Sequence, residues 1–411
     1  EEDELETVVA HELGHAVHYD MLLMTVAAAV PIILYTIYRS LMRSGDSDNK
    51  KPVHIALMAL VLYYVSEYIV LFLSRAREYY ADQFAGEATQ KPNTLAVALT
   101  KIAYGLAGKE PEEQKDEKKE RAPAPRRGLA RALGIFDPLG ARALVATTLG
   151  RGKLNTENML AAMQWDLWNP WARYYELHSS HPLPAKRIQA LGQLAQHQGQ
   201  APIVSFNLRQ PESYWDELTV DVFVMLLPLA GVLAGLAWMW GSTATQATGT
   251  SVFNAWGVLL FGGLGWLVKI LFEYRGADFA DFTVSGLLKK VKVSNIRPVS
   301  CRLRGTIIGR GIPGLLWSED MVLQDETGYI FLDYRQPLAF LEWLFGLFRT
   351  PGIIGQEVVV EGWYRRAPVP YVEMKTLRIR QSDTEHRSYV YPIKLVVAVG
   401  LLTVGLAWVL L

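Results

Sequence analysis

Long apolar runs separated by polar segments dominate the pattern of this chain. Five runs are long enough to cross a bilayer, whose hydrocarbon core requires roughly 20 helical residues. They are Met21–Tyr38, Val53–Leu73, Val220–Trp240, Val252–Phe272 and Ile393–Leu411. Because the runs are nearly uncharged and charged residues flank them, we expect five transmembrane helices. A buried helical hairpin of a soluble core is the alternative for the first two runs.

A different pattern occupies residues 283–382, where apolar and polar residues alternate over short runs. Turn residues such as Asp325–Gly328 and Pro351–Gly352 separate these runs. About five short strands with turns between them predict a small β-barrel, similar to an OB-fold. The very apolar stretch Leu338–Phe348 inside this module is expected on the membrane surface or against the spans.

The predicted fold is therefore mainly α, with a multi-span helical membrane part and a small carboxy-terminal β-barrel. We expect a first domain over residues 1–218 that includes the spans 21–38 and 53–73. A transmembrane hairpin over 219–273, with spans 220–240 and 252–272, follows it. The barrel over 283–382 comes next, and a last transmembrane helix over 393–411 closes the chain.

Charge sets an expected orientation in the membrane. Equal numbers of cationic and acidic residues, 41 each, give no net charge, which argues against a nucleic-acid-binding protein. Lys and Arg concentrate in Ser74–Glu217 and Lys289–Arg387, whereas the loops Arg39–Pro52 and Gly241–Ser251 carry less charge. The positive-inside rule makes the two long segments cytoplasmic. We expect a multi-pass plasma-membrane protein whose chemistry lies on the cytoplasmic side.

Two further features limit the reading of the chain. Cys301 is the single cysteine, so an intramolecular disulfide and a thiolate zinc cluster are both excluded. The chain begins Glu1-Glu2-Asp3, without Met or a signal-like segment. This start indicates a processed or truncated product, or a fragment.

The sequence His11-Glu12-Leu13-Gly14-His15 is the strongest chemical signal. Two histidines four residues apart lie on one face of a helix, so both imidazoles can reach one metal ion. Glu12 can sit beside a metal-bound water and take its proton, which is the layout of a zinc hydrolase. The apolar stripe Val9, Leu13 and Val17 supports the helix. Two helix histidines on a polar face are the alternative.

A second motif, Ser74-Arg75-Ala76-Arg77-Glu78-Tyr79-Tyr80-Ala81-Asp82, directly follows the second apolar run. Together with the first motif and the membrane hairpin, it resembles the membrane-bound M48 metallopeptidases, which include HtpX and the CAAX prenyl proteases. The resemblance implies a gluzincin-like HExxH core in which His11, His15 and Glu78 bind Zn²⁺ and Asp82 orients a ligand histidine. The alternative is that Glu78 and Asp82 are ordinary helix acids paired with neighbouring arginines.

The segment Ser180-His181-Pro182-Leu183, followed by Arg187-Ile188, is similar to a further M48 segment. The family carries Thr and a second Pro where this chain has Ser180 and Leu183. The resemblance covers about Thr7 to Leu194 and implies that His181 and Arg187 contact the substrate carbonyl. A second metal site with His178, or a purely structural turn, is the alternative. The spans that usually precede the His-Glu helix in the family are missing here.

The resulting hypothesis is an integral membrane zinc endopeptidase. Glu12 would act as general base on zinc-bound water, and the substrates would be membrane or misfolded proteins at the cytoplasmic face. The β-module would recruit substrates or mediate assembly, and no nucleic acid is expected to bind it. The alternatives are a non-proteolytic membrane scaffold with an idle or structural zinc site and a partner-binding β-module, and an intramembrane zinc protease.

Overall fold

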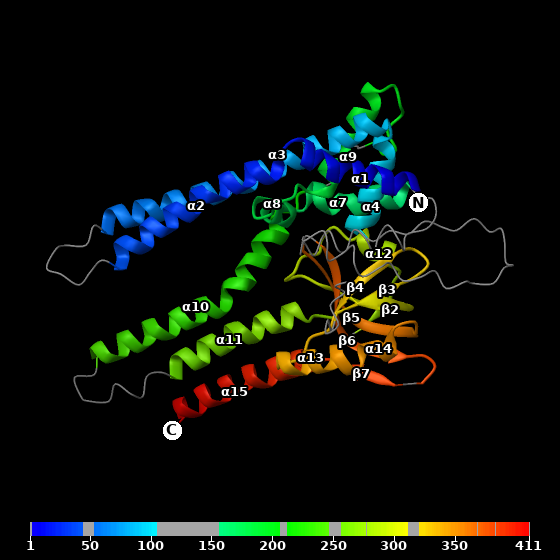
Figure 1. The fold of residues 1–411 in the computed structure, drawn as a ribbon. Helices are drawn as coiled ribbons and strands as arrows, with labels where there is room; N and C mark the ends of the chain where they lie inside the picture. Colours follow the sequence, from blue (N-terminus) through cyan, green and yellow to red (C-terminus); the bar gives the residue numbers. More distant parts are fainter. Residues whose placement is uncertain are drawn as a thin grey trace. The chain divides into compact units, whose positions relative to one another are not determined.

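The computed structural model describes residues 2–43, 53–104, 156–205, 212–245, 256–276, 278–310, 320–367, 369–382 and 384–410. The chain divides into two compact units, which are considered separately below (Figure 1). The first comprises Glu1–Ala103 and Asn155–Arg209, and the second comprises Tyr104–Leu154 and Gln210–Leu411. The predicted four-part division stays a prediction.

Helices form the described part of the first unit. They are α1 (Glu2–Val17), α2 (Asp20–Arg43), α3 (Val53–Thr89), α4 (Pro92–Tyr104), α7 (Thr156–Trp168), α8 (Pro170–Leu177) and α9 (Pro184–His197). α2 and α3 lie side by side as a hairpin (Figure 1) and are the first two candidate membrane spans. With 37 residues, α3 is about 55 Å long, whereas the hydrocarbon core is about 30 Å thick. The carboxy-terminal part of α3 therefore extends beyond the membrane.

α1 packs against this extension of α3 through a polar face. A Cβ atom on Gly14 would lie 3.0 Å from the Ala81 Cα atom, so glycine permits the close approach of the two helices. The apolar stripe of Val9, Leu13 and Val17 is exposed, by 49%, 55% and 55%. The helix was predicted, but its buried face is the one that carries the histidines.

Three further spans belong to the second unit: α10 (Trp215–Thr245), α11 (Trp256–Glu273) and α15 (Val390–Leu410). All five predicted spans thus correspond to helices long and apolar enough to cross a membrane, and the protein is a multi-pass membrane protein. Residues 252–255 and 411 of the predicted spans lie outside the described residues. Glycines of α10 line its contact with α11. Added Cβ atoms at Gly231 and Gly235 would collide with the backbone of α11.

Five strands of the second unit close into the predicted β-barrel. They are β2 (Val299–Arg310), β3 (Met321–Gln324), β4 (Tyr329–Asp333), β5 (Glu357–Arg366) and β6 (Pro370–Ile379). The order is β2-β3-β4-β6-β5, and β5 pairs with β2 to complete the circle. Among these pairs β4 and β6 are parallel and the others antiparallel. β1 (Ala280–Asp281) and β7 (Glu385–Arg387) extend the sheet.

Short helices accompany the barrel: α12 (Val284–Leu288), α13 (Ala339–Phe348) and α14 (Thr350–Ile353). α13 accounts for the apolar stretch predicted to lie on the membrane or against the spans. Its side chains Phe340 and Phe348 are 63% and 70% exposed, so the membrane-surface alternative stays a prediction. The barrel is joined to the spans by the apolar cluster of Ile270, Tyr274, Phe279, Trp363 and Ala398, contributed by α11, α15 and the barrel region.

The single cysteine offers a probe of barrel folding. Cys301 on β2 is fully buried, and burial raises the pKa of its thiol to about 12. At pH 8 only about one thiol in ten thousand is ionised in the folded state. We expect alkylation by iodoacetamide to be slow in native protein and fast in denaturant. Rapid native labelling, measured by intact-mass spectrometry, would contradict this packing.

Candidate active site

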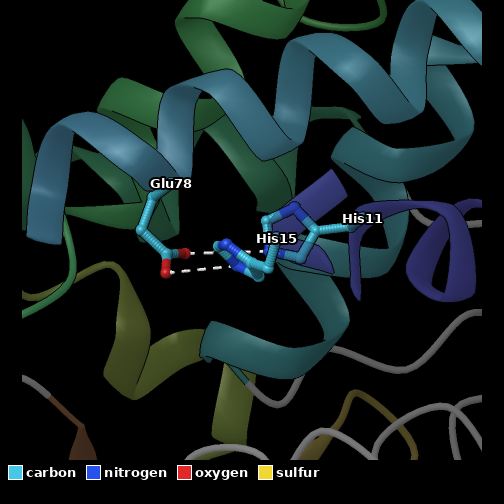
Figure 2. Close-up of side chains that lie close together, drawn as sticks. All are labelled: His11, His15 and Glu78. Carbon is cyan, nitrogen blue, oxygen red and sulfur yellow. Dashed lines mark ion pairs between the residues drawn. The ribbon is translucent and has the colours of Figure 1, made fainter. Parts of the chain in front are cut away.

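Two elements of the first unit bring the predicted metal ligands together. α1 supplies His11 and His15 one turn apart, and the extension of α3 supplies Glu78 (Figure 2). One ligand atom from each lies within 4.8 Å of the others. His11 Nε2 is 3.8 Å from Glu78 Oε2, and His15 Nε2 is 3.6 Å from Glu78 Oε1. Zinc with ligands at roughly 2.0–2.2 Å in tetrahedral geometry separates them by about 3.3–3.6 Å, so the donor types fit, and the ligand atoms would draw slightly closer together around an ion.

A carboxylate lies behind each histidine. His11 Nδ1 is 3.0 Å from Asp82 Oδ1, at ion-pair distance though outside hydrogen-bond geometry. His15 Nδ1 is 2.6 Å from Asp20 Oδ2. The two Nε2 atoms therefore face Glu78 while the Nδ1 atoms face carboxylates, as metal-binding histidines require.

Asp20 was not predicted from the sequence. It is the first residue of α2 and follows the turn at Tyr19, whose φ is +53°. This turn breaks the helix between α1 and α2, and it leaves the Asp20 carboxylate 2.6 Å from His15 Nδ1. Arg77 Nη1 donates to the Asp20 carbonyl oxygen at 2.9 Å and fixes the residue on α3. An acid directly after a short break in a histidine-bearing helix is the signal that could have identified it.

α9 contributes a buried arginine to the site. The Arg187 guanidinium donates to both oxygens of Asp82, each at 2.7 Å. Its Nη1 also lies 2.9 Å from Glu78 Oε2. Arg187 is buried, and besides these two carboxylates its Nη2 lies 3.4 Å from His11 Nε2.

Burial alone would raise the pKa of both carboxyl groups, but their partners outweigh it. A hydrogen bond from His181, whose Nδ1 is 3.0 Å from Glu78 Oε1, and the charge of Arg187 hold the pKa of Glu78 well below its usual range. The charge and hydrogen bonds of Arg187 likewise lower the pKa of Asp82. Both groups are ionised at neutral pH, which is the state that metal binding needs.

The contacts in the site bear on two alternatives: pairing of Glu78 and Asp82 with neighbouring arginines, and a second metal site with His178. Arg75 donates to the carbonyl oxygens of Glu176 and Ser179, both at 2.9 Å, rather than to the acids of its own helix. His178 Nε2 lies 3.1 Å from the Tyr68 hydroxyl, whereas His181 contacts Glu78. Within the described ranges, His11, His15 and Glu78 are the residues grouped closely enough to hold a metal ion. Glu12, between the histidines, is exposed.

Replacing Asp20 with Asn is expected to weaken metal binding about 10- to 100-fold. The amide keeps the size of the side chain but removes the charge that orients the His15 imidazole and raises its basicity. Competition with a zinc-binding dye measures the change. Asp3→Asn, on exposed α1 surface, is the control and should leave affinity unchanged. Equal affinities of the Asp20 variant and the parent would exclude this role.

The part of the chain that carries the site is similar to known proteases. Residues 1–195 match Peptidase family M48. A "Protease HtpX homolog" of Methanothermobacter thermautotrophicus is 42% identical over 107 residues, which are 26% of this chain and 40% of the relative. The proteins of the same name from Sulfurovum sp. and Archaeoglobus fulgidus are 36% and 31% identical, over 25% of this chain and 37% and 31% of theirs.

These matches are partial, because the chain spans two fifths or less of the length of these relatives. No solved structure matches the chain. The predicted resemblance is nevertheless confirmed, because the matched range contains both motifs of the site. The comparisons therefore show that residues 1–195 of this chain resemble Peptidase family M48 and are similar to proteins named as HtpX-homologue proteases.

Proposed function

We propose that this protein is an integral membrane zinc endopeptidase that hydrolyses peptide bonds of membrane or misfolded proteins at the cytoplasmic face. The observation that carries the proposal is the approach of three ligand atoms from His11, His15 and Glu78 to within 4.8 Å. Two nitrogen donors and one carboxylate form the protein ligand set of a catalytic zinc site, which keeps one position open.

Zn²⁺ bound there would supply a Lewis acid that lowers the pKa of water and polarises a carbonyl group. Glu12, exposed between the two histidines, accepts a proton from the attacking water and returns it to the leaving amine. The His181 side chain, 34% exposed and 3.0 Å from Glu78, donates to the oxyanion that develops on the substrate. Arg187 holds Glu78 and Asp82 in place and acts as a positioning residue.

The orientation follows from α3. Its amino-terminal part crosses the membrane, and the extension that carries Glu78 enters the segment rich in Lys and Arg. Such segments stay in the cytoplasm under the positive-inside rule. The proposed site therefore lies just outside the membrane on the cytoplasmic side of the plasma membrane, within reach of loops of other membrane proteins.

A non-proteolytic scaffold with an idle or structural zinc site is the second candidate. A structural zinc site is usually closed by four protein ligands, whereas three groups converge here. A structural site also needs no general base, whereas Glu12 directly follows His11, where a base of a zinc hydrolase is expected. Both features favour the enzyme.

The test compares purified, detergent-solubilised protein with its Glu12→Gln variant. We expect one zinc per chain in both, and a loss of casein cleavage of about 10²- to 10⁴-fold in the variant. Glu2→Gln, an exposed acid on the same helix, is the control and should cleave as the parent does. Zinc binding without cleavage by the parent would favour the scaffold. Absence of zinc from the parent would refute the metal site itself.

A further inference from the structure

A pocket of about 600 Å³ lies in the second unit, and none of the predicted metal ligands lines it. Its lining comes from the barrel strands β2, β5, β6 and β7, from Tyr274 directly after α11, and from Tyr391 at the start of α15. α11 and α15 are both candidate membrane spans. The pocket therefore lies where one span leaves the membrane and another enters it.

One wall of the pocket is aromatic. The ring of Tyr274 is 4.8 Å from that of Trp363 and 5.0 Å from that of Tyr391, measured between centroids. The Tyr274 hydroxyl donates to Glu373 at 2.8 Å, and the Trp363 indole donates to the Arg275 carbonyl oxygen at 3.2 Å. Tyr and Trp with satisfied polar ends are typical of the membrane–water interface.

Another part of the lining, the cationic wall, carries Arg and Lys side chains, and its acids are mostly engaged. Arg302 is paired with Glu361 at 2.8 Å. Glu373 accepts from Arg365, a buried side chain that does not line the pocket, at 2.7 Å. These two acids therefore do not offset the remaining cations.

Two arginines of this wall share one carboxylate. Arg387 and Arg378 both approach Glu385, at 2.8 Å and 3.7 Å. The Lys375 ammonium lies 4.3 Å from the centre of the Phe279 ring, and no acid of the described residues pairs with it. The wall carries a local excess of positive charge beside an aromatic surface.

We propose that this pocket binds a phosphate group, held by Lys375 and Arg387, with the attached apolar or glycerol moiety against Tyr274 and Tyr391. The position at the ends of two spans places the pocket at headgroup depth, where phosphate diesters are the abundant anions. Guanidinium and ammonium groups are the usual partners of phosphate in proteins. The ligand is a phospholipid headgroup or a soluble phosphate compound, and the experiment separates these sources. The proposal does not depend on peptidase activity.

The experiment uses the full chain, delipidated in a neutral detergent, and follows its melting temperature. Three probes are titrated: short-chain phosphatidylglycerol, short-chain phosphatidylcholine and inorganic phosphate. The test variant is Lys375→Gln with Arg387→Gln. The matched control, Arg304→Gln with Arg380→Gln, removes two exposed cations from the same barrel region outside the pocket.

We expect phosphatidylglycerol to raise the melting temperature saturably, with half-saturation roughly ten- to thirtyfold higher in the test variant. The control should stay within about twofold of the parent. The charge-keeping variant Lys375→Arg with Arg387→Lys should bind nearly as the parent does. If inorganic phosphate saturates the same effect and displaces phosphatidylglycerol, the pocket is a phosphate site for a soluble ligand.

Equal weakening of the test and control variants would overturn the proposal, because binding would then follow general surface charge. Absence of a saturable effect with both phosphatidylglycerol and phosphate would overturn it as well. Folding of each variant is checked by its melting temperature without ligand and by protection of Cys301 from alkylation. If the double variant does not fold, Arg387→Gln alone carries the test, because that side chain is 60% exposed.

Discussion

Replacing Arg187 with Met destabilises the amino-terminal unit by about 3–5 kcal/mol, because it leaves buried carboxylates without their cation. Asp82 loses two hydrogen bonds of 2.7 Å, and Glu78 loses an ion pair of 2.9 Å. The loss is expected to be largest in metal-free protein, since Zn²⁺ would itself compensate the charge of Glu78. Denaturant unfolding followed by tryptophan fluorescence measures the free energy of unfolding of the metal-free and the zinc-loaded protein.

Two variants separate the possible roles of Arg187. Arg173→Met removes an exposed arginine of the same unit and should change stability by less than about 0.5 kcal/mol. Arg187→Lys keeps the charge but not the two-pronged geometry, so its stability should fall between those of the parent and the Met variant. Lost cleavage at unchanged stability and zinc content would instead indicate direct substrate contact, as the family resemblance implied.

The proposed metal ligands were reached from the sequence in two ways: His11 and His15 from helical periodicity, and Glu78 from the family resemblance. Residues four apart share a helix face, so His11 with His15, and Glu78 with Asp82, form pairs whatever the rest of the fold does. Asp20 depends on the left-handed turn at Tyr19, a conformation that a tyrosine does not predict, so only its place directly after the break is a signal in the sequence. The burial of Arg187 depends on how α9 packs against α3, a contact across more than 100 residues.

The fold shows the same division between local and distant determinants. Apolar runs identified the spans because length and hydropathy alone define them. They did not show that the second span and the Glu78 motif form one continuous helix, Val53–Thr89. Alternation identified strands of the barrel, but its closure depends on the pairing of β4 with β6 and of β2 with β5. Such pairings join distant residues and leave no local pattern.

Replacing both Gly231 and Gly235 with Ala is expected to destabilise the second unit by about 2–6 kcal/mol, at 1–3 kcal/mol for each overpacked site. An added Cβ atom would lie 2.1 Å from the Phe261 carbonyl oxygen at the first position and 2.5 Å from the Val258 backbone at the second. Backbone cannot move aside as a flexible side chain does, so α10 and α11 must separate. Within a bilayer, close van der Waals packing of small residues is a main source of helix association.

The control for this pair is Gly400→Ala on α15, where an added Cβ atom meets nothing within 4 Å. Helix propensity favours Ala over Gly by about 1 kcal/mol, so this variant should melt at or above the temperature of the parent. Melting in mild detergent and alkylation of Cys301 report on the spans and the barrel. Because α11 packs on the barrel through Tyr274 and Trp363, separation of α10 from α11 should also expose Cys301 at a lower temperature. Unchanged melting of the double variant would mean that α10 and α11 do not meet through this glycine face. If the melting temperature falls while Cys301 stays protected from alkylation, the barrel folds without support from these spans.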